Sequence, residues 1–192
     1  MDISINPIYL CNYRCDTCYL TSEQLKSKQT LDSDDLFNRF VEVLSAGDSI
    51  EQVDMYGGEI ALLDDELFYK YVTTVEQFTN KSINLITNFS IVKPYMLDEK
   101  FNVAVSFDFS LRPDFEQVLE NIKTCNRDVA ILVLYSDKLK QSGVTPASFV
   151  ELFNSLDNVT SVELKPYSKN QSNSLEFSIT DYEQFIIDVI ET

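Results

Sequence analysis

The sequence predicts an α/β fold, a partial (β/α)6 TIM-like barrel with parallel strands, and three observations indicate it. Short apolar runs alternate along the chain with segments whose apolar residues recur at helical spacing. Parallel strands need crossover connections, and helices between the strands supply them. A strand–helix–strand unit takes about 30 residues, so six units occupy roughly 180 of the 192 residues. We therefore expect one domain over residues 1–192.

Three strands are expected in the first half of the chain, over Ile3–Leu10, Gln52–Tyr56 and Ile83–Thr87. Between and after these strands stand residues that favour the first turn of a helix, namely Asp32, Asp64 or Asp65, and Pro94. The first helix is expected to run to about Ala46, because Gly47 is a typical residue just past a helix end.

Three more strands are expected in the second half, over Val103–Phe107, Val129–Tyr135 and Val159–Leu164. The middle one is continuously apolar, which is typical of a strand buried on both faces. Helix starts are marked by Pro113, by Thr145 with Pro146, and by Thr180, which can form a capping box with Glu183. Residues 168–192 are expected to form a polar connection and a capping helix. The buried side of that helix is predicted to carry Ile186, Ile187 and Ile190.

The charge balance of the chain limits its partners. Lysine and arginine number 15 against 31 acidic residues, which gives a net charge of −16. Such a surface repels phosphate backbones and anionic lipid, so neither non-specific nucleic-acid binding nor membrane binding is expected. No secretory apolar segment is evident near the start of the chain, and the cysteines suit a reducing environment, so a cytoplasmic location is expected.

Three cysteines stand close together directly after the first predicted strand, at Cys11, Cys15 and Cys18. Iron–sulfur clusters are held by cysteine thiolates, usually four, so a compact set of three points to an iron open to another ligand. A structural zinc site needs four Cys or His ligands, whereas this chain has no histidine and only Cys125 besides. Disulfide frameworks belong to short secreted chains. The triplet also falls at the carboxyl end of a strand, where parallel barrels carry their reactive groups.

A second motif, Gly57-Gly58-Glu59, follows the second predicted strand. Glycine lets the backbone approach a ligand closely, and a carboxylate accepts hydrogen bonds from an amino group. An ordinary tight turn is the alternative explanation for such a sequence.

Together the two motifs resemble the radical S-adenosylmethionine (SAM) enzymes, whose cluster loop has three cysteines and whose second strand precedes a GGEP motif. The resemblance implies a [4Fe–4S] cluster whose fourth iron is chelated by SAM. The cluster ligands would be Cys11, Cys15 and Cys18. The amino group of SAM would be contacted by Gly57, Gly58 and Glu59. The sequence departs from the family pattern at Ile60, where proline is usual, and at Thr17, where many members have an aromatic residue.

Two later strand ends match the same family more loosely. Thr87-Asn88-Phe89 stands where the family often has Thr-Asn-Gly, and Ser106-Phe107-Asp108 stands where it often has Ser-x-Asp. The resemblance implies that SAM or substrate is bound by Asn88, Ser106 and Asp108. Polar residues are also common in ordinary turns at strand ends. Tyr167 is a candidate for stacking on adenine, or for a simple rim position.

The resemblance implies reductive cleavage of SAM to a 5′-deoxyadenosyl radical, which abstracts hydrogen from a substrate. Tyr19, directly after Cys18, matches the branch of the family that modifies peptides or proteins. Alternatives are a nucleoside- or nucleotide-modifying radical SAM enzyme and a degenerate iron–sulfur or metal-binding module without turnover. The implied partners are an electron donor such as flavodoxin or ferredoxin and a peptide or small-molecule substrate. No catalytic acid or base can be assigned. Three cations near strand ends are candidates for holding a substrate anion, although a solvated charge is the alternative explanation for each: Arg14, Arg112 and Lys165.

Overall fold

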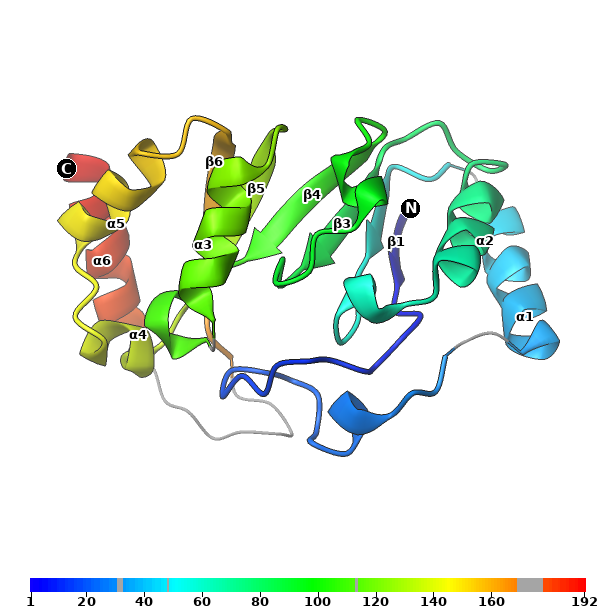
Figure 1. Cartoon of the computed structure of the whole chain (residues 1–192), viewed down its shortest axis with the longest axis horizontal. Coiled ribbons are helices and arrows are strands. Elements are labelled where there is room, and N and C mark those ends of the chain that lie inside the picture. The colour runs from blue at the N-terminus through cyan, green and yellow to red at the C-terminus, as the bar shows by residue number, and fades with distance from the viewer. Residues whose placement is uncertain (31–32, 48, 113, 169–177) are drawn as a thin grey trace.

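The structure, a computed structural model, describes residues 1–30, 33–47, 49–112, 114–168 and 178–192, and its centre is one parallel sheet (Figure 1). The strands follow one another across the sheet in chain order. They are β1 (Asp2–Ile5), β2 (Gln52–Met55), β3 (Ile83–Thr87), β4 (Phe101–Ser106), β5 (Val129–Tyr135) and β6 (Val159–Pro166). All neighbouring pairs are parallel, and β1 does not pair with β6. The predicted partial (β/α)6 barrel is confirmed.

Helices connect the strands. The α-helices are α1 (Asp34–Ser45), α2 (Asp65–Val75), α3 (Phe115–Thr124), α4 (Asp137–Gln141), α5 (Pro146–Asn154) and α6 (Ile179–Glu191). Short 3₁₀ helices are η1 (Gln24–Lys26), η2 (Ile60–Leu62), η3 (Pro94–Leu97) and η4 (Phe109–Leu111).

Side-chain caps explain where several of these helices begin. Asp64 accepts hydrogen bonds from two amides at the start of α2, and Thr145 forms a capping box with Ser148 at the start of α5. The cap of α1 is Ser33, which accepts a hydrogen bond from the amide of Leu36. The predicted helix starts at Asp32 and Pro113 lie outside the described residues.

One face of the sheet is buried beneath the helices. Side chains alternate between the two faces of a strand, and those on the helix side are almost completely buried, for example Val53, Leu85, Val105 and Ile131. Burial of such a side chain contributes about 1.5–3 kcal/mol relative to exposure. This apolar layer holds the strands in register and so fixes the relative positions of the loops that follow them.

The opposite, inward face of the sheet is only partly covered. Side chains aligned on three neighbouring strands form a hydrogen-bonded row there, since Asn84 donates to Asp54 (2.7 Å) and Asn102 donates to Asn84 (2.9 Å). The expectation that β5 is buried on both faces is wrong, because Ala130, Leu132 and Leu134 stay partly exposed. No described strand closes the barrel opposite them, so the inward face lacks the cover of a complete barrel.

The first strand ends earlier than predicted. β1 stops at Ile5 rather than at Leu10, because Pro7 has no amide hydrogen with which to continue the ladder. Beyond it the chain still runs beside the loop after β2, since Gly58 and Glu59 donate to the carbonyl oxygens of Ile8 and Leu10, both at 2.8 Å. The segment of residues 8–10, here called the stem of the cysteine loop, is therefore anchored without being a regular strand.

The last helix differs from its prediction in both start and orientation. Its N-cap is Ser178, which accepts from the amide of Asp181, and not Thr180. Ile187 and Ile190 are exposed, whereas Phe185 is buried beside the rings of Tyr135 and Phe149. Aromatic packing thus selects a different face of α6 from the isoleucine stripe. None of the described helices is long and apolar enough to cross a membrane.

Candidate active site

A cavity of about 200 Å³ lies at the carboxyl ends of the strands. It is lined by seven of the nine residues that the sequence singled out, which are Cys11, Cys15, Cys18, Gly57, Gly58, Asn88 and Ser106. The other two, Glu59 and Asp108, are buried and do not line the cavity. The fold therefore brings the cysteine triplet and the paired glycines, some 40 residues apart, to one hollow.

The cysteine loop is shaped by hydrogen bonds to its own sulfur atoms. The amides of Tyr13 and Leu20 lie 3.3 Å from Cys11 Sγ and 3.4 Å from Cys18 Sγ, respectively. Asn88 Nδ2 lies 3.9 Å from Cys11 Sγ. Donors directed at sulfur stabilise negative charge there and tune iron–sulfur centres. The loop thus offers the donor environment that thiolate ligands require.

The sulfur atoms share the cavity without converging on one point. Among the described residues, no three Cys, His, Asp or Glu side chains are gathered as ligands of a single metal ion. A zinc ion would require such convergence. In a four-iron cluster each thiolate binds a different iron, so the sulfurs stand apart around the cluster. Three cysteine side chains around one cavity are a donor set of the kind that holds a [4Fe–4S] cluster with one open iron.

Burial affects the protonation of these thiols. It raises the pKa of Cys15 to about 11, against the opposing effect of the nearby Arg112 cation. Burial also raises the pKa of Cys11, despite the amide hydrogen bond from Tyr13. Both are therefore thiols at neutral pH before metal is bound. Metal binding must release protons, so loading of this site is favoured by higher pH.

The paired glycines allow a close backbone contact. A Cβ atom on Gly58 would lie 2.2 Å from the carbonyl oxygen of Tyr9 and 2.3 Å from that of Leu10. A Cβ atom on Gly57 would lie 2.3 Å from the carbonyl oxygen of Ile8. Only glycine permits this approach. The glycines thus hold the stem of the cysteine loop in place. Their contact with SAM stays a prediction.

Glu59 links the same loop to the end of β3. It is 1% exposed, and its Oε1 accepts hydrogen bonds from Thr87 Oγ1 (2.6 Å) and from the amide of Ala61 (3.0 Å). Its Oε2 accepts from the amide of Asn88 (2.7 Å). Burial raises the pKa of this carboxyl, and the three hydrogen bonds oppose that shift. In this structure Glu59 does not line the cavity itself but holds in place Thr87 and Asn88, which do.

Asn88 connects the β3 end to the cysteine loop, and a left-handed residue follows it. Its Nδ2 donates to Asn12 Oδ1 (2.9 Å) and its Oδ1 accepts from Ser90. Phe89 then adopts φ 57°, a conformation that favours the glycine typical of the resembled family. The strain costs about 1–3 kcal/mol, and the complete burial of the Phe89 ring offsets it.

For Arg112 the sequence left two interpretations open, a cation that holds a ligand anion and a solvated charge. Its side chain, 12% exposed, lines the cavity, and its Nε donates to Asp108 Oδ2 at 2.8 Å. Asp108 Oδ1 also accepts from the amide of Leu134 (3.3 Å). Burial alone lowers the pKa of Arg112, but Asp108 and Cys15 more than offset this, so the guanidinium remains charged. Asp108 therefore holds a cation in the cavity. The i, i+4 spacing of Asp108 and Arg112 was the sequence signal that could have indicated this pairing.

The remaining candidates lie away from the cavity or serve the loop itself. Arg14 Nη1 donates to the carbonyl oxygens of Cys11 (2.7 Å) and Tyr13 (2.6 Å). Lys165 is exposed and lies 3.2 Å from Glu163. Tyr167 is buried and is not among the residues that line the cavity. Cavity-lining residues that the sequence did not single out as ligands include Tyr56, Thr87 and Leu134. Their types gave no specific signal, and only the fold brings them there.

Comparison with known proteins identifies the fold. No protein-family model matches the chain, and no curated protein matches its sequence. Among solved structures, hexahistidine-tagged anSMEcpe with bound AdoMet (SAM) is 18% identical with a TM-score of 0.75, covering 100% of this chain and 59% of that one. Native anSMEcpe with bound AdoMet and Cp18Cys peptide is 18% identical with a TM-score of 0.74, covering 99% and 58%. Streptococcus suis SuiB bound to precursor peptide SuiA is 14% identical with a TM-score of 0.71, covering 99% and 45%.

These solved structures are radical SAM enzymes, and the chain has their fold over its whole length. It spans about three fifths of the length of anSMEcpe and less than half of SuiB. The chain therefore has the fold of these radical SAM enzymes, and one cysteine triplet lines its cavity. Activity, substrate and partners of this chain are matters for proposal.

We predict that Gly58→Ala lowers the free energy of unfolding by about 1–3 kcal/mol, because the new Cβ meets fixed backbone oxygens. Gly47→Ala is the matched control, since its Cβ would meet only the flexible end of the Met1 side chain. Urea unfolding of both variants checks this. Equal losses in the two variants would show that the stem contact is not a constraint.

Glu59 makes a pH-dependent contribution to stability. Because its pKa is raised in the folded state, its contribution is fully present below the unfolded value of about 4.5 and is lost as pH rises through the folded value. We predict that Glu59→Gln has a lower free energy of unfolding than wild type at low pH, because the amide group cannot reproduce the hydrogen bonds of the protonated carboxyl. The difference between the two proteins should narrow as pH increases, because the wild type then loses the contribution of Glu59. Urea unfolding across this range measures it, with the exposed Glu183→Gln as control. A difference that stays constant with pH would contradict the assignment.

Proposed function

We propose that this chain is a radical SAM enzyme that binds a [4Fe–4S] cluster through Cys11, Cys15 and Cys18. The observation that supports this most strongly is the single cavity lined by all three cysteines and by the Gly57-Gly58 pair. When bound, the reduced cluster would supply the electron that splits SAM into methionine and a 5′-deoxyadenosyl radical able to take hydrogen from a substrate. The residues of the chain hold, orient and shield these groups.

We propose that Arg112 binds the carboxylate of SAM. Asp108 occupies the guanidinium Nε, and no described residue accepts a hydrogen bond from its two terminal nitrogens. In a protein with a net charge of −16, a carboxylate ligand needs such a fixed cation. Ser106, on the strand end before Asp108, can donate a further hydrogen bond. Asn88 and the backbone of the Gly57-Gly58 loop remain candidates for the polar groups of SAM.

Apolar and aromatic side chains complete the proposed site. Ile86 and Leu134 line the cavity from β3 and β5, and Tyr19 and Tyr56 line it beside Cys18. Radical chemistry requires that water and stray hydrogen donors be kept from the reactive carbon. These side chains supply that shielding, while the partly covered inward face of the sheet leaves a route for a substrate.

We propose a peptide or protein as the substrate. Two of the structures that share this fold contain peptides, Cp18Cys with anSMEcpe and SuiA with SuiB. The partly exposed inward face of the present sheet carries Asp54, Asn84 and Asn102, whose side chains can also hydrogen-bond to the amide groups of a peptide. The proposed enzyme also needs a one-electron donor, for which a flavodoxin or ferredoxin is suited, and the reducing cytoplasm.

The proposal predicts that protein purified without oxygen and reconstituted with iron and sulfide releases 5′-deoxyadenosine when SAM and dithionite are added. Cys15→Ala should lose the iron–sulfur absorption while retaining its far-ultraviolet circular dichroism. Cys125→Ala, a buried cysteine outside the cavity, should retain both. Zinc in place of iron, or an intact cluster in Cys15→Ala, would contradict the ligand assignment. A cluster that never cleaves SAM, with or without candidate peptides, would favour a binding module.

We also predict that Arg112→Lys weakens SAM binding to the reconstituted protein about tenfold, or about 1.4 kcal/mol, because an ammonium cannot reproduce the fork of a guanidinium. Isothermal titration with SAM measures the dissociation constant. Arg39→Lys, on the exposed face of α1, is the matched control. Iron content should be the same in both variants. An unchanged dissociation constant in Arg112→Lys would remove Arg112 from the proposed SAM site.

A further inference from the structure

The cysteine loop carries a charge balance opposite to that of the rest of the chain. Residues 11–28 contain three basic and two acidic side chains, whereas the remaining residues contain 12 basic and 29 acidic ones. The basic residues of the loop are Arg14, Lys26 and Lys28, and all three are exposed. None of them forms an ion pair with a described residue, unlike Lys138 and Lys140 at the same end of the fold.

Backbone contacts bring these three cations around the first cysteine. The amide of Cys11 donates to the carbonyl oxygen of Leu25 (3.1 Å), which places Lys26 beside it. An antiparallel bridge between Ile8 and Thr30 brings the segment of Lys28 alongside the stem of the loop.

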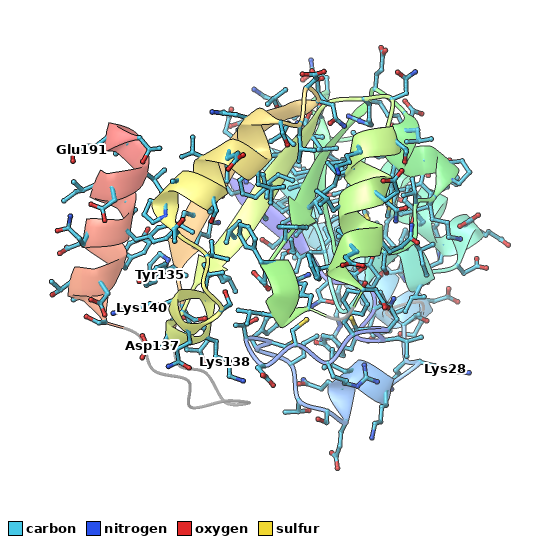
Figure 2. All side chains as sticks on the ribbon, turned by 60° about the vertical axis from the view of Figure 1, so that its left-hand side comes forward. Lys28, Tyr135, Asp137, Lys138, Lys140 and Glu191 are labelled. Carbon is cyan, nitrogen blue, oxygen red and sulfur yellow. The ribbon has the colours of Figure 1, made fainter. Side chains whose placement is uncertain are left out.

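Arg14 lies closer still, because its guanidinium is bonded to the carbonyl oxygens of Cys11 and Tyr13. Figure 2 shows Lys28 projecting from the body of the molecule.

One of the two acidic side chains of the loop is already neutralised. Asp16 forms an ion pair with Lys138 of α4. The local surface therefore carries more positive charge than the sequence count indicates. A patch of this kind, in a chain of net charge −16, attracts an acidic protein to one place while the rest of the surface repels it.

We propose that Arg14, Lys26 and Lys28 form the docking surface for an acidic electron-donor protein. This inference rests on the proposed function, which needs an electron at the cluster held by the neighbouring cysteines. One electron would pass from the donor to the bound cluster, so that the donor is oxidised and the cluster reduced by one unit, with no bond or proton changing place. Docking here sets the donor beside Cys11, whose carbonyl oxygen accepts a hydrogen bond from the Arg14 guanidinium of this surface (2.7 Å).

The test uses reconstituted protein and a reduced, acidic flavodoxin as the probe. Stopped-flow absorption gives the rate of cluster reduction over a series of salt concentrations. We expect Lys26→Gln/Lys28→Gln to reduce the second-order rate constant at low salt about tenfold and to flatten its salt dependence. The variant leaves Arg14 in place, so the hydrogen bonds that shape the loop are retained.

The matched control is Lys81→Gln/Lys123→Gln, which removes the same charge near the amino ends of the strands, away from the cavity. It should retain the wild-type rate apart from a small general effect. Cleavage of SAM with excess dithionite should be the same in all three proteins, which shows that the site itself is intact.

The two proposals fail in different ways. If wild-type protein cleaves SAM with dithionite but both double variants accept electrons from flavodoxin at the wild-type rate, the docking surface is overturned and the enzyme assignment stands. Equal losses in the two double variants would also overturn it, because they would show an effect of overall charge alone. Absence of SAM cleavage in wild-type protein would remove the proposed function on which the inference rests.

Discussion

The close approach between the Gly57-Gly58 loop and the stem of the cysteine loop is the contact on which the site depends. Two hydrogen bonds of 2.8 Å join the segments, at a separation that leaves no room for a side chain on either glycine. Because Pro7 ends the first strand early, the stem has no regular ladder to hold it. The loop that would bind SAM is therefore also the loop that locates the cysteines. In the proposed enzyme this backbone contact would couple the position of the cluster to that of SAM.

Two buried acidic side chains, Glu59 and Asp108, support the remaining walls of the cavity. Glu59 secures the end of β3 through Thr87 and Asn88, and Asn88 in turn lies against Cys11. On the opposite side, Asp108 fixes the guanidinium of Arg112. Both carboxyl groups accept hydrogen bonds from protein donors and do not line the cavity. Glu59 thereby orients Thr87 and Asn88, and Asp108 orients Arg112. The cavity thus presents three cysteines and the Arg112 guanidinium among neutral polar, aromatic and apolar side chains.

Much of the fold could be predicted because its local signals agree with its topology. The bounds of β3 and β5 match the predicted strands, and the cap of α5 is the predicted Thr145. The buried face of α6 could not be predicted, because it is set by the contact of Phe185 with the rings of Tyr135 and Phe149, which lie elsewhere in the chain. The partial exposure of β5 likewise depends on a barrel that stays open.

The candidate site divides in the same way. The cysteine triplet and the glycine pair are contiguous motifs that follow two neighbouring strands, so the sequence alone predicts that they share a site. Glu59 turns away from the cavity because it hydrogen-bonds to Thr87, 28 residues along the chain, and such a contact has no local signature. The i, i+4 spacing of Asp108 and Arg112 was a local signal for their pairing, but it did not show that the guanidinium lines the cavity.

The most direct test of the account is electron paramagnetic resonance of the reduced, reconstituted protein mixed with SAM that carries a magnetic isotope at its amino nitrogen. We predict a [4Fe–4S] signal whose hyperfine spectrum shows coupling to that nitrogen, because SAM would occupy the iron that Cys11, Cys15 and Cys18 leave free. A cluster signal with no coupling at saturating SAM, or a protein that binds no cluster, would contradict the account.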